Sequence, residues 1–373
     1  MENKWSRLDQ LLKEMWLAGV SHVHLVEGSP VVARQRGRQV LPREGHARLV
    51  QREDIDALAE AVGWPGRTAA SIDANGEWRA VVRLNSAAAA GAPGTGLGEA
   101  RRQLIAQVKM LPHTPMPLEE FRYAPNLKMQ FGQQGVVVVA GSHCSGRTSA
   151  AMSFCCALAR MREASGVSFG SVERSIEYVL TGSMLSGAMN VAAPVVAQLE
   201  VGSDVRGWND GVELLQLGDY DITFVGDGAP LQDGRPLALG PSLGRVAASG
   251  KLVFTTVTAE SYTDAFMLMA GGTEAVPRDA ARLASQMKAI ILQELLRENG
   301  RVVWCHSVAL VFTPNMRQML ADTCESGVTV DRVRKIFAQF LTQSGLAGAG
   351  SVSYAEGLGR VPENYRHLVT LRS

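Results

Sequence analysis

The sequence predicts an α/β protein organised as two domains, and three observations carry that prediction. The chain has 373 residues, a length that usually divides into two domains. Residues 136–139 are four consecutive valines, which is typical of a strand buried on both faces in a parallel sheet. From residue 118 onward, strand-like runs alternate with helix-like runs. Such alternation predicts a parallel or mixed sheet covered by helices.

Composition and charge exclude several classes of protein. Hydrophobic residues make up 46% of the chain and charged residues 20%, as in a globular protein with a large core. The formal net charge of +1 gives no reason to expect nucleic acid as a partner. The five cysteines lack C-x-x-C spacing, so we expect no disulfide framework and a reducing cytoplasm. Charged residues interrupt the start of the chain, so no secretory signal is expected, and the uncharged stretch 178–199 is too polar for a membrane helix.

Residues 1–100 predict a small α+β domain. The spacing of apolar residues predicts amphipathic helices over 5–18 and 53–62. Alternating apolar and polar residues predict strands over 20–28 and 78–84 and a hairpin over 31–40.

His22 and His24 lie on one face of the first predicted strand, and Val23 and Leu25 lie on the other. Two histidines at i and i+2 are able to ligate a metal, but no third ligand is near them in the sequence. We therefore interpret both histidines as exposed strand residues.

A change of composition follows this domain. Residues 86–100 are rich in alanine and glycine and lack periodicity, which predicts a mobile loop or linker. Basic residues, among them Arg102 and Lys109, flank a strand-like run that is most simply a solvated strand edge. We place the N-terminal domain at 1–100, a linker at 101–117 and the second domain at 118–373.

The second domain is predicted to be built from further strands and helices after the valine strand. Strands are predicted over 167–179, 219–228 and 251–260, a helix over 279–296, two strands joined by a turn over 301–312, and mostly helix over 313–343.

The valine strand runs into a glycine-containing loop that fits the spacing G-x-x-x-x-G-K-[ST] with one change. Gly141 and Gly146 occupy the glycine positions, Thr148 occupies the hydroxyl position, and Arg147 occupies the lysine position. Glycines let backbone N–H groups surround a phosphate, and the next helix directs its positive end at the same anion. The alternative interpretation is a strand-to-helix turn that binds no ligand.

This loop predicts a nucleotide site for ATP and Mg²⁺. The residues expected to contact the nucleotide are Gly141, Ser142, Ser145, Gly146, Arg147, Thr148 and Ser149. Thr148 is expected to bind the magnesium ion. Arg147 keeps a positive charge, but a planar guanidinium differs in shape from the compact ammonium of lysine.

Acidic residues follow two of the predicted strands. Glu173 and Glu177 fall near the carboxyl end of the strand over 167–179, and Asp227 comes directly after the next. Ligands of open α/β sheets gather at the carboxyl ends of strands. We therefore expect these carboxylates at the site.

Eight stretches, in order, resemble motifs of the PilT-like branch of the secretion and type IV pilus ATPases, and they cover nearly the whole chain. They are SHVHLVEGSPVVARQRG at 21–37, RLN at 83–85, QVKMLPHTPMPLEEF at 107–121, VERSIEY at 172–178, AQLEVGSDVRGW at 197–208, GDYDITFVGD at 218–227, SGKLVFTTVTAES at 249–261 and TPNMRQMLAD at 313–322. The last is similar to a motif that the family associates with retraction.

The resemblance implies a PAS-like N-terminal domain followed by a RecA-like P-loop NTPase domain. It implies a homo-oligomeric ring, commonly a hexamer, at the cytoplasmic face of the inner membrane beside a pilus platform protein. It also implies nucleotide between the two domains of one subunit, closed by cations at the positions of Arg83, Arg102 and Lys109. Glu177 would orient the attacking water, and Asp227 would hold magnesium through a water molecule.

Several positions depart from the family pattern. Arg147 replaces the loop lysine, Asp227 replaces a glutamate, and Lys251 and Thr258 replace two histidines of the His box. Other family residues are lost at Arg174, Ser175, Leu199 and Ser203, whereas Thr148, Glu173, Glu177 and Asp221 remain. Since phosphoryl transfer depends on positioning and charge stabilisation, these losses predict a hydrolysis rate near background.

Three functional hypotheses follow. The first is a motor subunit that binds ATP with weak or absent hydrolysis and works beside a competent paralogue. The second is an active ATPase that drives pilus retraction. The third is a non-catalytic, ring-forming adaptor at the pilus base.

Overall fold

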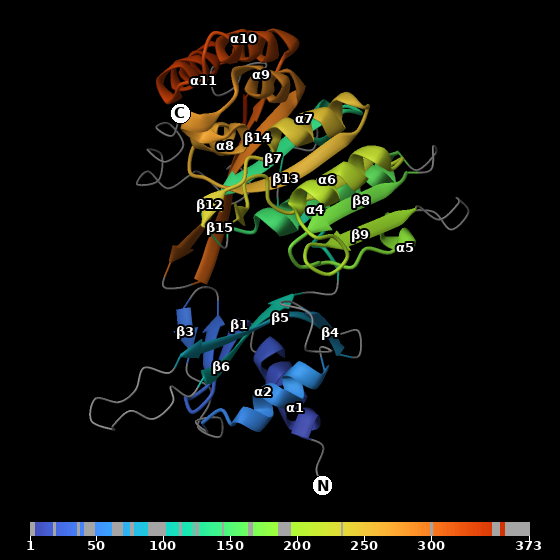
Figure 1. The fold of residues 1–373 in the computed structure, drawn as a ribbon, viewed down its shortest axis with the longest axis vertical. Helices are drawn as coiled ribbons and strands as arrows, with labels where there is room; N and C mark the ends of the chain where they lie inside the picture. The colour runs from blue at the N-terminus through green and yellow to red at the C-terminus, as the bar shows by residue number, and fades with distance from the viewer. Residues whose placement is uncertain are drawn as a thin grey trace. The chain divides into compact units, whose positions relative to one another are not determined.

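The computed structural model describes residues 4–17, 20–35, 38–40, 49–61, 70–74, 78–88, 102–111, 114–121, 123, 127–143, 145–162, 167–185, 195–232, 234–298, 301–344 and 351–354. The chain divides into two compact units. The first consists of Met1–His113 with Arg174–Val179 and Glu298–Arg301. The second consists of Thr114–Glu173, Leu180–Arg297 and Val302–Ser373. Figure 1 labels most of the elements of both.

The first unit is an antiparallel sheet with two helices packed on it. Its six strands have the order β3-β2-β1-β6-β5-β4. They are β1 (Val20–Val26), β2 (Val32–Gln35), β3 (Arg38–Val40), β4 (Ala70–Ala74), β5 (Trp78–Ala88) and β6 (Arg102–Leu111). Helices α1 (Lys4–Leu17) and α2 (Arg52–Ala61) contact each other and lie on the same face of the sheet (Figure 1).

The core of the first unit follows from the helical spacing of apolar residues in its helices and from their alternation with polar residues in its strands. Leu8, Leu12 and Met15 form the buried stripe of α1, while Val23 and Leu25 are the buried face of β1. Both helices predicted here are confirmed, and so is the apolar face of the first strand. His22 and His24, on the other face, are half-buried rather than exposed.

Strand β5 is longer than predicted. It continues through residues 86–88, which pair with β6 as Ser86↔Leu104 and Ala88↔Arg102. The predicted linker at 86–100 therefore begins too early, because a partner strand supplies ladder hydrogen bonds whatever the local propensity. The rest of that prediction lies outside the described residues.

The second unit is a largely parallel sheet of eight strands in the order β16-β15-β14-β7-β13-β10-β8-β9. The strands are β7 (Gly135–Gly141), β8 (Phe169–Glu173), β9 (Val196–Glu200), β10 (Ile222–Val225), β13 (Leu252–Thr258), β14 (Met287–Glu298), β15 (Arg301–Val311) and β16 (Ser351–Tyr354). A two-stranded ribbon is formed by β11 (Leu231–Gln232) and β12 (Arg235–Pro236). This confirms the predicted α/β class, and the unit has the RecA-like arrangement.

Helices cover both faces of this sheet. They are α3 (Leu127–Gln130), α4 (Arg147–Met161), α5 (Gly182–Leu185), α6 (Trp208–Leu217), α7 (Gly240–Ala248), α8 (Tyr262–Ala270), α9 (Pro277–Gln286), α10 (Pro314–Glu325) and α11 (Val330–Ser344), with short 3₁₀ turns η2 (Leu118–Phe121) and η4 (Gly272–Glu274). Val136 and Val138 of β7 belong to the core formed with α6 to α11. On the other face, Phe154 of α4 stacks on Phe254 of β13 at a ring distance of 6.1 Å. Helices α9, α10 and α11 gather at one end of the unit (Figure 1).

The valine strand is central, as predicted. All seven residues of β7 are buried, and the strand pairs in parallel with β13 on one side and β14 on the other. The next strand along the chain, β8, lies on the far side of β13 and β10. The chain therefore leaves β7 toward one side of the sheet, while β14, on the other side of β7, comes later in the sequence. The loop after β7 lies at the carboxyl end of the strand next to this change of direction, which is where α/β sheets bind ligands.

Two predictions in the last third of the chain were wrong. Residues 279–296 are not one helix, because α9 ends at Gln286 and β14 begins at Met287. The run KAIILQELL also has helical spacing, but pairing with β7, for example Ile290↔Val138, decides in favour of a strand. Residues 301–311 form the single strand β15 rather than two strands with a turn.

Candidate nucleotide-binding site

The candidate site begins where β7 ends and α4 starts. Gly141 is the last residue of β7, and Arg147 is the first of α4. Gly146 is the N-cap of the helix and has left-handed backbone angles, with φ 82° and ψ 18°. The first N–H groups of a helix lack partners within the helix and carry its positive end. A helix of 15 residues thus directs that end toward the loop.

The close approach of β14 explains why Gly141 must be a glycine. A Cβ atom here would lie 2.1 Å from the carbonyl oxygen of Gln293 and 2.6 Å from Oγ of Ser145. Both distances are well inside van der Waals contact. The two motif glycines are therefore required for different reasons, crowding at Gly141 and a positive φ at Gly146.

Ser145 has a feature typical of an anion-binding loop. Its side chain is 1% exposed, and its Oγ has no hydrogen-bond partner among the described residues. An orphaned buried hydroxyl costs free energy unless a ligand or water satisfies it. A phosphate oxygen would accept this proton, so the loop fits the group that the motif predicts.

The other described residues of the loop lie around the start of α4. Thr148 and Ser149 are half-buried in the first turn of α4, and Ser142 is exposed beside the end of β7. A threonine hydroxyl in that turn suits a magnesium ion bound to phosphates.

Arg147 reaches across the carboxyl edge of the sheet. Its Nη1 donates a hydrogen bond of 2.7 Å to Oγ1 of Thr258, the last residue of β13. Thr258 pairs with Gly141 in the β7–β13 register. A cation at a helix N-terminus opposes the helix dipole, and a bound anion relieves that conflict.

Two predicted carboxylates end strands of this sheet. Asp227 is half-buried two residues beyond β10, and its Oδ1 accepts a 3.0 Å hydrogen bond from the N–H of Ala229. Glu173 ends β8 and is 2% exposed. Its Oε1 accepts hydrogen bonds from Ser171 Oγ at 2.9 Å and Gln198 Nε2 at 3.4 Å. Because β8 and β10 are parallel neighbours, both acids lie at the same edge as the loop.

Glu177 and Arg102 belong to the first unit. Glu177 forms an ion pair with Lys109 of β6, with Oε1 and Nζ 2.5 Å apart. Its other carboxylate oxygen is buried without a hydrogen-bond partner among the described residues. Arg102 is the first residue of β6, paired with Ala88 of β5.

Lys251 and Asp221, from two further motifs, lie at the amino ends of strands of the second unit, whereas the loop lies at the carboxyl ends. Lys251 precedes β13, and its Nζ donates to the carbonyl of Gln216 and to Ser249 Oγ, both at 3.2 Å. Asp221 precedes β10 and accepts hydrogen bonds from Ser168. A seven-residue strand, about 23 Å long, separates Lys251 from the loop end of β13. Neither residue lies at the nucleotide loop.

Gln293 contacts the loop and Tyr123 contacts Gln293, and neither was predicted from the sequence. Gln293 of β14 is fully buried and donates a 2.7 Å hydrogen bond to the carbonyl of Ser145. Tyr123 donates to Gln293 at 2.5 Å. Both lie far from the loop in sequence, and a lone glutamine in an apolar run is the only local signal.

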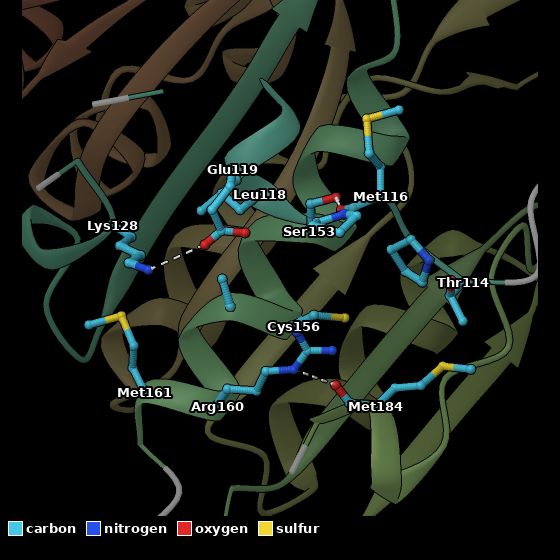
Figure 2. Close-up of a pocket in the computed structure, with 13 residues that line it drawn as sticks. Thr114, Met116, Leu118, Glu119, Lys128, Ser153, Cys156, Arg160, Met161 and Met184 are labelled. Atoms are coloured by element: carbon cyan, nitrogen blue, oxygen red, sulfur yellow. Dashed lines mark hydrogen bonds and ion pairs between the residues drawn. The ribbon is translucent and has the colours of Figure 1, made fainter. Parts of the chain in front are cut away.

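A separate cavity of about 370 Å³ lies along α4, and none of the described residues of the loop over 141–149 lines it. Figure 2 shows the segment 114–119 on one side and α4 on the other, with Ser153 bonded to the carbonyl of Met116. Cys156 lines this cavity, and burial raises the pKa of its thiol to about 11. The thiol is therefore neutral at pH 7 and a poor nucleophile.

Solved structures of three ATPase chains are similar over most of both lengths. DotB of Legionella pneumophila has 17% identity and a TM-score of 0.66, covering 91% of this chain and 88% of that one. DotB of Yersinia pseudotuberculosis has 17% identity and a TM-score of 0.67, covering 90% and 86%. The pilus retraction motor PilT with bound ADP has 18% identity and a TM-score of 0.63, covering 90% and 89%. The chain has the fold of the secretion and pilus ATPases.

The predicted resemblance to PilT-like ATPases is thereby confirmed at the level of the fold. No protein-family model and no curated protein matches the sequence. Among the described residues, no helix is both long and apolar enough to cross a bilayer.

Proposed function

We propose that this protein is a PilT-like motor subunit of a type IV pilus or secretion machine that binds ATP and hydrolyses it weakly or not at all. The observation that carries the proposal is the loop from Gly141 to Ser149. It combines two required glycines, a helix N-terminus and the unsatisfied, buried hydroxyl of Ser145. These are the components from which proteins build a phosphate cradle.

The loop supplies most of the nucleotide contacts in this proposal. Backbone N–H groups and the helix dipole hold the phosphates, and neither depends on the side chain at position 147. Arg147 adds a positive charge at the mouth of the loop. Thr148 directly and Asp227 through a water molecule would hold magnesium, which when bound would neutralise charge on the phosphate oxygens.

The weak hydrolysis follows from the side chains that surround the loop. The guanidinium of Arg147 is wide and planar and is already hydrogen-bonded to Thr258, whereas a lysine would present a compact ammonium. Asp227 has a shorter reach than glutamate, and Thr258 has no imidazole. Each missing transition-state contact costs on the order of 3 kcal/mol, so several together reduce turnover to near background. Glu173 and Glu177 are the remaining acids for orienting water, with Arg102 as a closing cation.

Assembly and location belong to the same proposal. The subunit forms a homo-oligomeric ring, a hexamer, that also accepts a catalytically competent paralogue. The ring works at the cytoplasmic face of the inner membrane against a pilus platform protein. The fold shared with DotB and PilT supports this part of the proposal.

Two measurements in sequence test the function. Calorimetric titration with ATP and ADP, with and without Mg²⁺, measures binding, and a phosphate-release assay then measures turnover. Saturable binding with release close to the buffer rate is the expected result. Rapid magnesium-dependent release would identify an active retraction ATPase instead, and absence of binding would leave a ring-forming adaptor.

A further inference from the structure

We infer that Gln293 and Tyr123 are positioning residues that set the orientation of the nucleotide loop through the peptide group of Ser145. The inference rests on the proposed function, because it assigns these residues a role in nucleotide binding. Neither residue lies in the loop, and neither belongs to the sequence motif from which the loop was predicted.

Gln293 touches the loop at three positions. It lies on β14 opposite Gly141. Its backbone carbonyl oxygen would lie 2.1 Å from a Cβ atom at position 141. Its Nε2 donates to the carbonyl of Ser145 at 2.7 Å. The same nitrogen would lie 3.0 Å from a Cβ at Gly146. Gln293 therefore limits the space at both motif glycines, through its backbone carbonyl at Gly141 and through its side-chain amide at Gly146.

The amide of Gln293 has a single favourable orientation. It is fully buried, so both of its polar atoms need partners. The carbonyl of Ser145 only accepts, so it must face Nε2, which donates. The hydroxyl of Tyr123 then donates to Oε1 at 2.5 Å. A flipped amide would face the carbonyl of Ser145 with a second acceptor, so Ser145 selects the orientation and Tyr123 supplies the partner of Oε1.

The hydrogen bond to Ser145 also determines the direction of the next N–H group. In a planar trans peptide, C=O and N–H point in opposite directions. With its oxygen turned toward β14, the Ser145–Gly146 peptide turns its N–H away from β14. An anion needs N–H donors, and a carbonyl oxygen turned toward it would repel it.

Tyr123 is held in place by aromatic packing. Its ring lies 4.7 Å from that of Phe154 on α4 and 5.8 Å from that of Phe121. The residue is 7% exposed. Because the ring is fixed, Tyr123→Phe removes the hydroxyl without opening a cavity.

The test compares Tyr123→Phe, Gln293→Met and the double variant with wild type. Amide hydrogen exchange of the loop peptide is the first readout, and titration with ATP is the second. We expect faster loop exchange and roughly five- to tenfold weaker ATP binding in each single variant, the scale of one hydrogen bond. The double variant should bind ATP about as weakly as Gln293→Met does, because both changes break the same series of hydrogen bonds from Tyr123 through Gln293 to Ser145. Tyr220→Phe, at the opposite edge of the sheet, should change neither readout.

The outcomes separate the inference from the proposed function. Unchanged loop exchange and unchanged ATP affinity in both single variants, in folded protein, would overturn the inference. Faster loop exchange in a protein whose wild type binds no ATP would support the positioning role and overturn the nucleotide function. Additive effects in the double variant would show that the two residues act independently, which also contradicts the proposed chain.

Discussion

Nη1 of Arg147 lies 2.7 Å from Oγ1 of Thr258, so the residue at the lysine position of the loop contacts a His-box position of β13. By resemblance to the PilT-like ATPases, both positions carry a different residue in the family. The two departures are therefore in direct contact, and the long arginine is matched by a short hydroxyl. A lysine introduced alone at position 147 would be too short to reach Thr258. A histidine introduced alone at position 258 would be too large for the arginine that already reaches it.

The first prediction concerns turnover. Arg147→Lys alone should restore little phosphate release, because groups that act together in a transition state do not recover one at a time. Adding Thr258→His and Asp227→Glu should raise release on the order of 100-fold above the single variant. Lys251→His is the control and should have no effect, since Lys251 bonds to Gln216 at the opposite edge. Full recovery with Arg147→Lys alone would make the arginine the single lesion.

The second prediction concerns binding. Gly146→Asp should abolish ATP binding, because it places a carboxylate at the N-terminus of α4, where the phosphate is expected. Gly234→Asp is a matched control, since Gly234 also has a positive φ, 78° against 82°, and its Cβ would meet open space. Gly146→Ala tests strain without the charge and should weaken binding less than the aspartate. Calorimetric titration of the three variants separates charge from strain. Equal ATP affinity in wild type and Gly146→Asp would remove the nucleotide from this loop.

The third prediction concerns the ion pair of the first unit. Lys109→Met should destabilise the protein more than Glu177→Gln does, because it leaves a carboxylate that is only 17% exposed without its cation. The lysine is 35% exposed, so we expect a coupling energy of about 1 kcal/mol rather than the larger value of a deeply buried pair. Urea unfolding of both singles and the double variant gives this coupling. Zero coupling at low salt would show that the pair adds nothing to stability.

The sequence was most informative where structure is locally determined. The four valines and the two glycines specify a buried strand and a tight turn within a few residues, and the structure has both. The strand β14 was missed because KAIILQELL satisfies helical spacing equally well, and only its neighbour β7 decides. Pairing between distant segments is absent from local periodicity.

The site shows the same division. The loop residues were found by spacing, whereas Tyr123 and Gln293 were missed because they lie 170 residues apart and meet only in the fold. By resemblance Lys251 was counted among the changed positions that weaken hydrolysis, yet strand direction places it at the amino end of β13, away from the loop. The predicted strand over 251–260 already begins at Lys251, so the strand assignment was sufficient to place this residue away from the carboxyl end, where ligands bind.

The last prediction concerns stability at high pH. Burial raises the pKa of the Cys156 thiol from 9.0 to about 11 and that of Cys324 from 9.0 to about 12. A folded state that holds a proton more tightly than the unfolded state loses stability as the pH rises above the unfolded pKa. The contribution of Cys156 is thus complete below about pH 9 and is lost progressively up to pH 11. For this shift the loss is about 2 to 3 kcal/mol. Unfolding free energies of wild type and Cys156→Ala between pH 7 and 11 test this, with a shallower decline expected in the variant. Parallel curves for the two proteins would show that the thiol does not titrate differently in the folded and unfolded states.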